Sequence, residues 1–426
     1  MVRGIRAGLS YLQAGARVDS GQEDADKPGA RSPFPLRDAK INGEIEMHAT
    51  EQGKRIHLID MARFYAMALV YYGHFIERLM ILENPSAEIQ YRFVYSFHMV
   101  LFVVLAGYVA RESDVEMCFT RFLKARMLTR LLPFVFFTAV FMGLAAFIPG
   151  EFFNLKLPSA EGYAGGLIAT LSGLPLFCVP SWFILLIFSV ELVHFAVFRF
   201  LRASDARIVV AALLFYVVGY WFNLYFDIFN PAKGRVLGWN YLFIHEAVTM
   251  YAFYLVGIWL KRHRSLLENL PVASALPAAL AFLLIVAFTF NLNTGPFNFN
   301  YHNSVVIMFS GHGNFLLFPL TALAGSLCIL LLAQCAPTQR TILWLGQNTL
   351  LLIFLNGVFY HFINARVAEW AQQAISLPFL NVFVLGCVVT LASLALCIPC
   401  VYLFSRFVPQ LVGKPKVSGP WFPNLL

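Results

Sequence analysis

Two ionisable residues in the first long apolar run have types and a spacing suited to chemistry. Arg63 and His74 are eleven positions apart. On an α-helix this spacing returns both side chains to nearly the same face, about 16 Å apart along the axis. A guanidinium binds anionic groups, and an imidazole exchanges protons near neutral pH. The alternatives are that Arg63 extends to lipid phosphate and that His74 is a packed, hydrogen-bonded core residue.

Other polar residues interrupt or flank the apolar runs, where each is a functional hypothesis by default. Arg126 and Arg130 precede the third run, where phosphate binding and ordinary positive flanking are both reasonable interpretations. Glu191 and His194 are three positions apart and share a helix face. We expect this pair to interact, to orient His74 or to contact a substrate; a buried ion pair that stabilises the bundle is an equally good account.

Three further residues have narrower expectations. His98 opens the second apolar run and Glu246 the sixth, and both are weak candidates for a substrate-binding or orienting role. Asp60 is expected to be the N-cap of the first helix. The one close cysteine pair, Cys397 and Cys400, has no second pair to complete a zinc site, so we expect packing there and no metal.

The composition determines which elements must position these residues. The chain has 426 residues, of which 59% are hydrophobic and 13% charged, whereas an average soluble domain is about 45–50% apolar and about 25% charged. This composition excludes a water-soluble enzyme and a disordered or disulfide-stapled chain. Despite the net charge of +8, no basic stripe with interleaved aromatics occurs, so a nucleic-acid partner is not expected.

Apolar runs of the length that spans a bilayer as a helix follow one another from residue 58. They predict an all-α integral membrane protein with about ten transmembrane helices. The predicted spans are residues 59–81, 92–111, 128–149, 181–200, 207–226, 240–260, 273–291, 313–335, 342–363 and 378–404. Residues 162–180 are expected to be a re-entrant or extramembrane loop, and residues 304–312 are too few to span.

The cations between the spans predict the topology. If the N-terminus is cytoplasmic, the cytoplasmic gaps hold 17 Lys and Arg residues and the outer gaps hold six. This bias predicts that both termini are cytoplasmic. We expect the protein to lie in the cytoplasmic (inner) membrane, with the lipid bilayer as its partner. Residues 1–55 are charged and lack an apolar run, so we expect a disordered extension. Residues 411–426 are expected to be a short cytoplasmic tail.

Five short blocks of sequence, taken in order, resemble the membrane-bound acyltransferase 3 family over residues 56–410. The blocks are Leu58–Arg63 with Gly73 and His74, Ser96–Tyr108, Arg126–Pro133, Ser181–Phe183, and Leu345–Asn348 with Asn356. There are three departures. Arg126 and Arg130 enclose three residues where the family more often has two, Asn356 occupies a place where a His is common, and we expect no additional domain after residue 406, where some members have one.

The resemblance implies transfer of an acyl group from acyl-coenzyme A, most simply acetyl-coenzyme A, to a hydroxyl of a glycan or lipid-linked sugar. A sugar hydroxyl is a poor nucleophile near neutral pH, so His74 is expected to be the general base; a transient acyl-histidine is the alternative. Arg63, Arg126 and Arg130 are expected to bind the phosphates of coenzyme A at the cytoplasmic end. Its pantetheine arm would then run along one seam towards His74.

A rival function from another class is a secondary transporter or flippase. Ten helices with buried charges also describe such proteins. Transporters often have repeated halves and helices broken at matching positions, and this sequence has no evident repeat of its two halves. The sequence therefore favours the enzyme and leaves the acyl group and the acceptor open.

Overall fold

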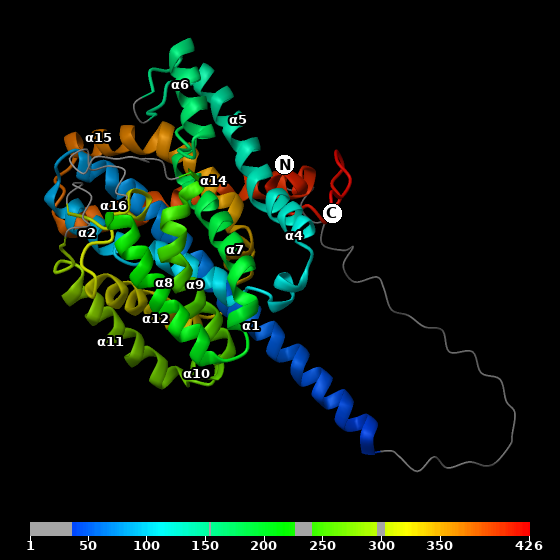
Figure 1. The fold of residues 1–426 in the computed structure, drawn as a ribbon. Helices are drawn as coiled ribbons and strands as arrows, with labels where there is room; N and C mark the ends of the chain where they lie inside the picture. The colour runs from blue at the N-terminus through cyan, green and yellow to red at the C-terminus, as the bar shows by residue number, and fades with distance from the viewer. Residues whose placement is uncertain (1–35, 153–154, 226–240, 296–302) are drawn as a thin grey trace, which may run out of the picture. The chain divides into compact units, whose positions relative to one another are not determined.

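The computed structural model of the chain describes residues 36–152, 155–225, 241–295 and 303–426, with side chains from residue 57 onward except that of Tyr225. The described residues form helices and no strand (Figure 1). They belong to two units, residues 1–52 and 53–426, and every cavity and side-chain contact described below lies in the second. Most of the predicted extension, residues 1–55, lies outside the described residues.

The helices follow one another closely along the chain. The first half comprises α1 (Leu36–Ile81), α2 (Pro85–Tyr95), α3 (His98–Tyr108), η2 (Glu112–Glu116), α4 (Phe119–Arg126), η3 (Met127–Leu131), α5 (Leu132–Phe147), α6 (Ala160–Leu171), η4 (Val179–Ser181), α7 (Trp182–Leu201) and α8 (Asp205–Tyr225). The second half comprises η6 (Tyr241–Phe243), α9 (Ile244–Arg262), α10 (Ser265–Glu268), α11 (Val272–Thr289), η7 (Ile307–Phe309), α12 (Leu317–Cys335), α13 (Arg340–Gln347), α14 (Thr349–Val358), η8 (Phe359–Ile363), α15 (Asn364–Ala374), α16 (Phe379–Phe407) and η9 (Pro409–Val412).

Nine helices in the described part of the chain are long and apolar enough to cross a membrane. They are residues Pro85–Tyr108, Phe119–Phe147, Val179–Leu201, Asp205–Leu224, Tyr241–Arg262, Val272–Thr289, Leu317–Cys335, Thr349–Ala374 and Phe379–Phe407. Each overlaps one of the ten predicted spans. The prediction of a multi-pass, all-helical membrane protein is therefore confirmed.

The remaining predicted span, residues 59–81, forms the second half of α1. This stretch is more polar than the nine because it holds four charged residues and a histidine, namely Asp60, Arg63, Glu77, Arg78 and His74. The expectation that Asp60 caps this helix is wrong, because α1 already begins at Leu36. The carboxylate of Asp60 is therefore free to bind side chains of other elements.

Two predicted spans have different boundaries in the structure. The second is divided into α2 and α3, because the backbone leaves helical geometry at Phe97. Its α2 begins where Asn84 accepts a hydrogen bond from the backbone N–H of Ala87, with Pro85 at the first helical position. The ninth begins at Thr349, after the separate short helix α13, and continues to Ala374.

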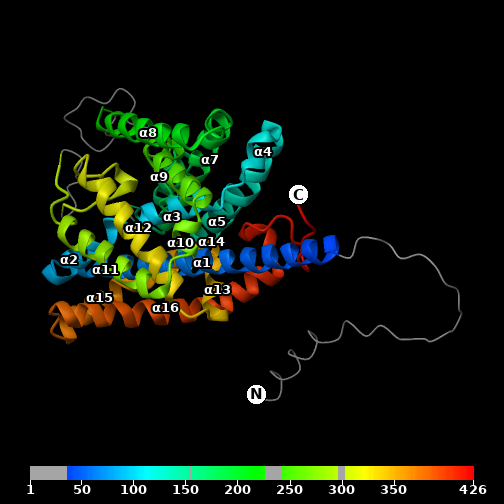
Figure 2. The ribbon, with the colours of Figure 1, turned by 90° about the horizontal axis from the view of Figure 1, so that it is seen from below.

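The second half of α1 lies alongside α16 (Figure 2). The hydroxyl of Tyr71 lies 3.2 Å from the Cys397 sulfur, and the ring of Tyr72 packs on Phe383. Cys397, one member of the close cysteine pair, thus packs against the α1 core. On the other side α3 packs on α9, α9 on α8, and α11 on α12. Residues 58–80 of α1 are themselves buried or half-buried, so the charged residues of this stretch are enclosed by protein.

The two segments that were too short or too irregular to be predicted as spans fold as short pieces. The predicted loop 162–180 contains most of α6 and reaches η4. Residues 304–312 contain η7, and backbone hydrogen bonds between Val306 and Gly311 close this segment on itself. Both pieces contribute to the site.

Candidate functional site

One cavity of about 250 Å³ is lined by three cations from separate parts of the chain. Arg63 comes from α1, Arg130 from η3 and Lys414 from the residues after η9. Among the described residues that line it there is no Asp or Glu. We call this space the arginine cavity, and its surplus of positive charge suits a ligand that carries several negative charges.

Arg63 is held by the residue that precedes it by one turn. A carboxylate oxygen of Asp60 lies 3.6 Å from the Arg63 guanidinium, and the other accepts a hydrogen bond of 2.9 Å from Gln347. Gln347 comes this close because its neighbour is a glycine: a Cβ at Gly346 would lie 2.0 Å from the Asp60 carbonyl oxygen. The contact of α13 with α1 thus fixes one wall of the arginine cavity.

Arg130 lies in η3, a π-helical turn between α4 and α5. Such turns insert an extra residue into a helix and are frequent at functional sites. Glu191 of α7 accepts two hydrogen bonds from Arg130, of 2.8 and 3.3 Å, and lies 3.4 Å from the Arg126 guanidinium. Its side chain is only 6% exposed. A buried carboxylate with two arginines holds Arg130 in place.

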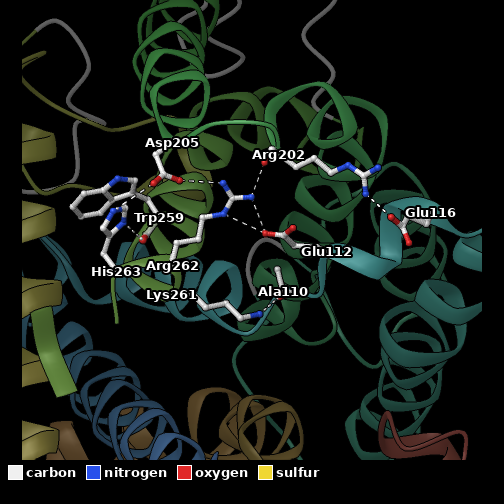
Figure 3. Close-up of polar contacts among 9 residues, drawn as sticks. All are labelled: Ala110, Glu112, Glu116, Arg202, Asp205, Trp259, Lys261, Arg262 and His263. Atoms are coloured by element: carbon white, nitrogen blue, oxygen red, sulfur yellow. Dashed lines mark hydrogen bonds and ion pairs between the residues drawn. The ribbon is translucent and has the colours of Figure 1, made fainter. Parts of the chain in front are cut away.

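Arg126 does not line the arginine cavity. It connects Glu191 of α7 to the η2 turn instead. It donates a hydrogen bond of 2.5 Å to Asp114, which lies in η2. The η2 turn is anchored at both ends, since Arg262 binds Glu112 and Arg202 binds Glu116 (Figure 3).

The same polar cluster connects three loops at one end of the helices. Arg262 also binds Asp205 and the carbonyl of Arg202, and Lys261 donates a hydrogen bond to the carbonyl of Ala110 (Figure 3). These contacts join the residues after α3, the α7–α8 connection and the end of α9. Several of the cations that the sequence assigns to the cytoplasmic gaps therefore lie together.

A second cavity, of about 300 Å³, is lined by His74 and His98 and is called here the histidine cavity. Glu77, Arg78 and several tyrosines also line it, while the rest of its wall is apolar. The apolar part comes from Leu174, Leu176, Val179 and the segment Val305–Phe309. The two short pieces of irregular structure thus close the histidine cavity.

His74 is fixed by a hydrogen bond of 2.5 Å between its Nδ1 and Oδ1 of Asn356 on α14. An amide oxygen only accepts hydrogen bonds, so Nδ1 carries the proton. The neutral imidazole then has its free lone pair on Nε2. His74 lines the histidine cavity, and the residue is 9% exposed. This tautomer leaves Nε2 able to accept a proton.

His98 has a similar arrangement and lies at the start of α3. Its Nδ1 donates a hydrogen bond of 2.9 Å to the carbonyl of Val94, and its ring packs edge-on against Tyr95. The predicted residues His74 and His98 are therefore brought together at one cavity.

The π-helical turn η8 supplies a further wall of the histidine cavity. Arg78 packs over the ring of Tyr360 and donates a hydrogen bond of 2.8 Å to Glu151. The hydroxyl of Tyr360 donates to Glu77, and His361 accepts a hydrogen bond from the backbone N–H of Val179 at the start of η4. The charged side chains of Arg78 and Glu77, which line the histidine cavity, therefore each have a hydrogen-bond partner.

The two cavities lie end to end along the same helices. On α3, Met99 lines the histidine cavity and Phe102 lines the arginine cavity. On α7, Trp182 lines the histidine cavity and Phe183 lines the arginine cavity. Three residues of helix rise about 4.5 Å. On α1 the nearest lining residues, Met67 and His74, are seven residues or about 10.5 Å of rise apart, so a layer of one to two turns separates the cavities. The rings of Phe102 and Phe183 lie 5.6 Å apart within it. We call the four side chains from α3 and α7 the partition.

Other predicted residues lie elsewhere. The expected pairing of Glu191 with His194 does not occur: Glu191 binds the two arginines, and His194 lies near Tyr251, 3.4 Å from its hydroxyl. Glu246 is fully buried and lines neither cavity. It accepts a hydrogen bond from Ser310, beside the segment that walls the histidine cavity. Arg63 and His74, expected along one seam, line separate cavities.

Sequence reasoning did not assign a role to Asn356, Gln347 or Lys414. Asn356 was marked only as a departure from a pattern that often has His. Gln347 and Asn348 stand in a recognised block, but that block does not reveal the contact with Asp60. In the sequence, Lys414 is only one of the 17 cations assigned to the cytoplasmic gaps. The signal for all three is tertiary, since each acts on a residue from another helix.

Comparison with known families gives one match. A family model described as an acyltransferase domain, acyltransferase 3, matches residues 56–401 of the chain. The searches of curated proteins and of solved structures find no match. The matched residues include those lining both cavities except Lys414 and its immediate neighbours, and the match does not favour a transporter or flippase.

Proposed function

The chain belongs to the acyltransferase 3 family, and from this we propose that it moves an acyl group, most simply acetyl, from acyl-coenzyme A to a hydroxyl of a carbohydrate or lipid-linked sugar. That the chain is a multi-pass membrane acyltransferase follows from the family and from the nine apolar helices of the described residues. The donor, the acceptor and the residue roles below belong to the proposal.

Coenzyme A would bind with its phosphates in the arginine cavity. Guanidinium groups pair with phosphate oxygens through two parallel N–H bonds. Arg63 and Arg130 present such groups to the cavity, while Asp60 and Glu191 hold them from behind. Arg126 would act through Glu191, as a positioning residue.

The hydroxyl acceptor would enter the histidine cavity, whose tyrosines, Trp182 and paired charges suit a sugar that is both polar and able to stack on aromatic rings. Nε2 of His74 would take the hydroxyl proton as the oxygen attacks the thioester carbonyl. The carbon–sulfur bond then breaks, and the proton passes from the imidazolium to the departing thiolate of coenzyme A. Asn356 holds the tautomer that this step requires.

The pantetheine arm must pass the partition to bring the thioester to His74. The partition consists of side chains on α3 and α7, so rotation of Phe102 and Phe183 would open a path without movement of the helices. Donor and acceptor would then approach from opposite ends of the bundle. With both termini cytoplasmic, as the bias of cations indicates, the donor end faces the cytoplasm of a cell whose inner membrane holds the protein.

The observation that carries this proposal is the placement of arginines in one cavity and of a histidine with a free Nε2 in the next cavity along the same helices. The test uses the full chain in lipid nanodiscs with acetyl-coenzyme A labelled in its acetyl group and a cell-envelope glycan extract. We expect label to reach the glycan. Arg63→Ala should weaken binding of coenzyme A, while Arg340→Ala, an exposed arginine, should not.

Two outcomes would contradict the proposal. One is a wild-type protein that binds no coenzyme A at millimolar concentration. The other is equal transfer of label with and without the protein. Proteoliposomes that accumulate a solute without consuming acetyl-coenzyme A would support the transporter instead.

A further inference from the structure

The residues after α16 form a folded cap rather than a loose tail. Helix α16 is followed by η9, and the backbone N–H of Lys414 donates to the carbonyl of Pro409. Gln410 is fully buried, and its amide donates hydrogen bonds to the carbonyls of Val417 and Phe422. These contacts fix the course of the chain as far as Phe422.

Gly413 shows how closely this cap approaches the bundle. Its φ angle is +84°, in the left-handed region that favours glycine. A Cβ at this position would lie 2.2 Å from a methyl carbon of Leu350 on α14 and 3.2 Å from the carbonyl oxygen of Thr129 in η3. The backbone turns here against α14 and η3, the elements that also wall the arginine cavity.

This turn directs Lys414 to the arginine cavity. Its ammonium donates a hydrogen bond of 2.7 Å to Oδ1 of Asn348 and lines the cavity with Arg63 and Arg130. Asn348 takes one of the three N–H donors of the ammonium. Partial burial lowers the pKa of Lys414, since desolvation disfavours the charged form.

Lys414 differs from the two arginines in one respect. Arg63 has Asp60 and Arg130 has Glu191 as carboxylate partners. Among the residues that the structure describes, no carboxylate lies within the 4.0 Å of an ion pair from Lys414. A half-buried cation next to two others is stabilised when an anion binds, so the cavity gains most from a ligand near Lys414.

We propose that residues Pro409–Lys414 of this cap are part of the donor site and that Lys414 binds a phosphate group of coenzyme A. The inference rests on the proposed function and extends it beyond the span that the family model matches, which ends at residue 401. Coenzyme A carries a diphosphate and a further phosphate, enough for three cations. Lys414 would supply a point charge beside the two planar guanidiniums.

The test compares binding of coenzyme A by the wild-type chain, Lys414→Met, Lys414→Arg and Lys416→Met in nanodiscs. Lys416 is the matched control, because it is exposed and two positions away. We expect Lys414→Met to bind coenzyme A about tenfold more weakly, as for the loss of one charged hydrogen bond. Lys414→Arg should recover most of the affinity, and Lys416→Met should match the wild type.

A second ligand separates phosphate binding from a structural role. Pantetheine contains the thiol arm without phosphates, so its affinity should be the same for the wild type and Lys414→Met. Equal loss of both ligands in Lys414→Met would overturn the inference, as would unchanged affinity for coenzyme A. A wild-type chain that binds no coenzyme A would instead overturn the proposed function on which the inference rests.

Discussion

His74 and Asn356 are hydrogen-bonded across 282 positions of the chain, from α1 to α14. This contact determines which nitrogen of the imidazole carries the proton and which one is available to accept another. It also joins the first and the late blocks of the sequence at the histidine cavity. The first two predictions follow from it.

Replacement of His74 by Ala should abolish turnover and leave binding of coenzyme A near normal, because the imidazole acts on the acceptor proton and lies outside the arginine cavity. A positioned base contributes about 10²–10⁴-fold, so the loss should be of this order and in kcat. Single-turnover transfer of labelled acetyl, measured beside donor binding, checks it. Wild-type transfer by His74→Ala would remove the residue from the mechanism.

Replacement of Asn356 by Leu should lower turnover by about tenfold, since one hydrogen bond that holds the ring is lost. Asn356→Asp retains an oxygen that accepts from Nδ1 and should be closer to the wild type. The two variants are compared by kcat at saturating donor. If Leu and Asp were equally impaired, the role of Asn356 would be packing rather than orientation.

Replacement of Glu191 by Gln should destabilise the protein by about 3–5 kcal/mol, because two buried guanidiniums lose the carboxylate between them. The control is Glu116→Gln, whose side chain is 61% exposed and pairs with Arg202; it should cost about 0–1 kcal/mol. Thermal unfolding in nanodiscs measures both. Similar melting temperatures for the two variants would show that the Glu191 network contributes little.

Enlargement of the partition by Phe183→Trp should slow transfer by roughly tenfold to a hundredfold, as expected when a reactive group is kept from its proper position. Binding of coenzyme A should change little, since the phosphates bind beyond the partition. Phe200→Trp is the control, on the same helix and 61% exposed. A variant Phe183→Trp that transfers as fast as this control would show that the thioester takes another path.

Much of the fold could be predicted from apolar run lengths, because a bilayer requires about 20 apolar residues for each helix. The break between α2 and α3 could not, since Phe97 is as apolar as its neighbours and only the backbone leaves the helix there. The π-helical turns were equally hidden. They shift the register of Arg130 and Tyr360 by one residue, and a sequence pattern carries no mark of that.

The candidate site likewise contains residues whose place could be predicted from the sequence and residues whose place could not. The spacing of Arg63 and His74 is a local property of one helix, so the sequence placed both on one face. The partner of Glu191 depends on the packing of α7 against η3, and local spacing wrongly favoured His194. Lys414 reaches its cavity only because the chain turns back at Gly413, a tertiary contact that composition does not encode.

The partition has a consequence for the cell as well as for the reaction. The hydrocarbon layer that insulates a membrane is about 30 Å thick, whereas the two cavities leave a layer of one to two helical turns between them. The side chains of this layer, those of the partition among them, then have to seal the membrane against ions and protons. A substitution that loosens Phe102 or Phe183 is therefore expected to make the membrane leaky, a cost to the cell that is separate from any loss of acyl transfer.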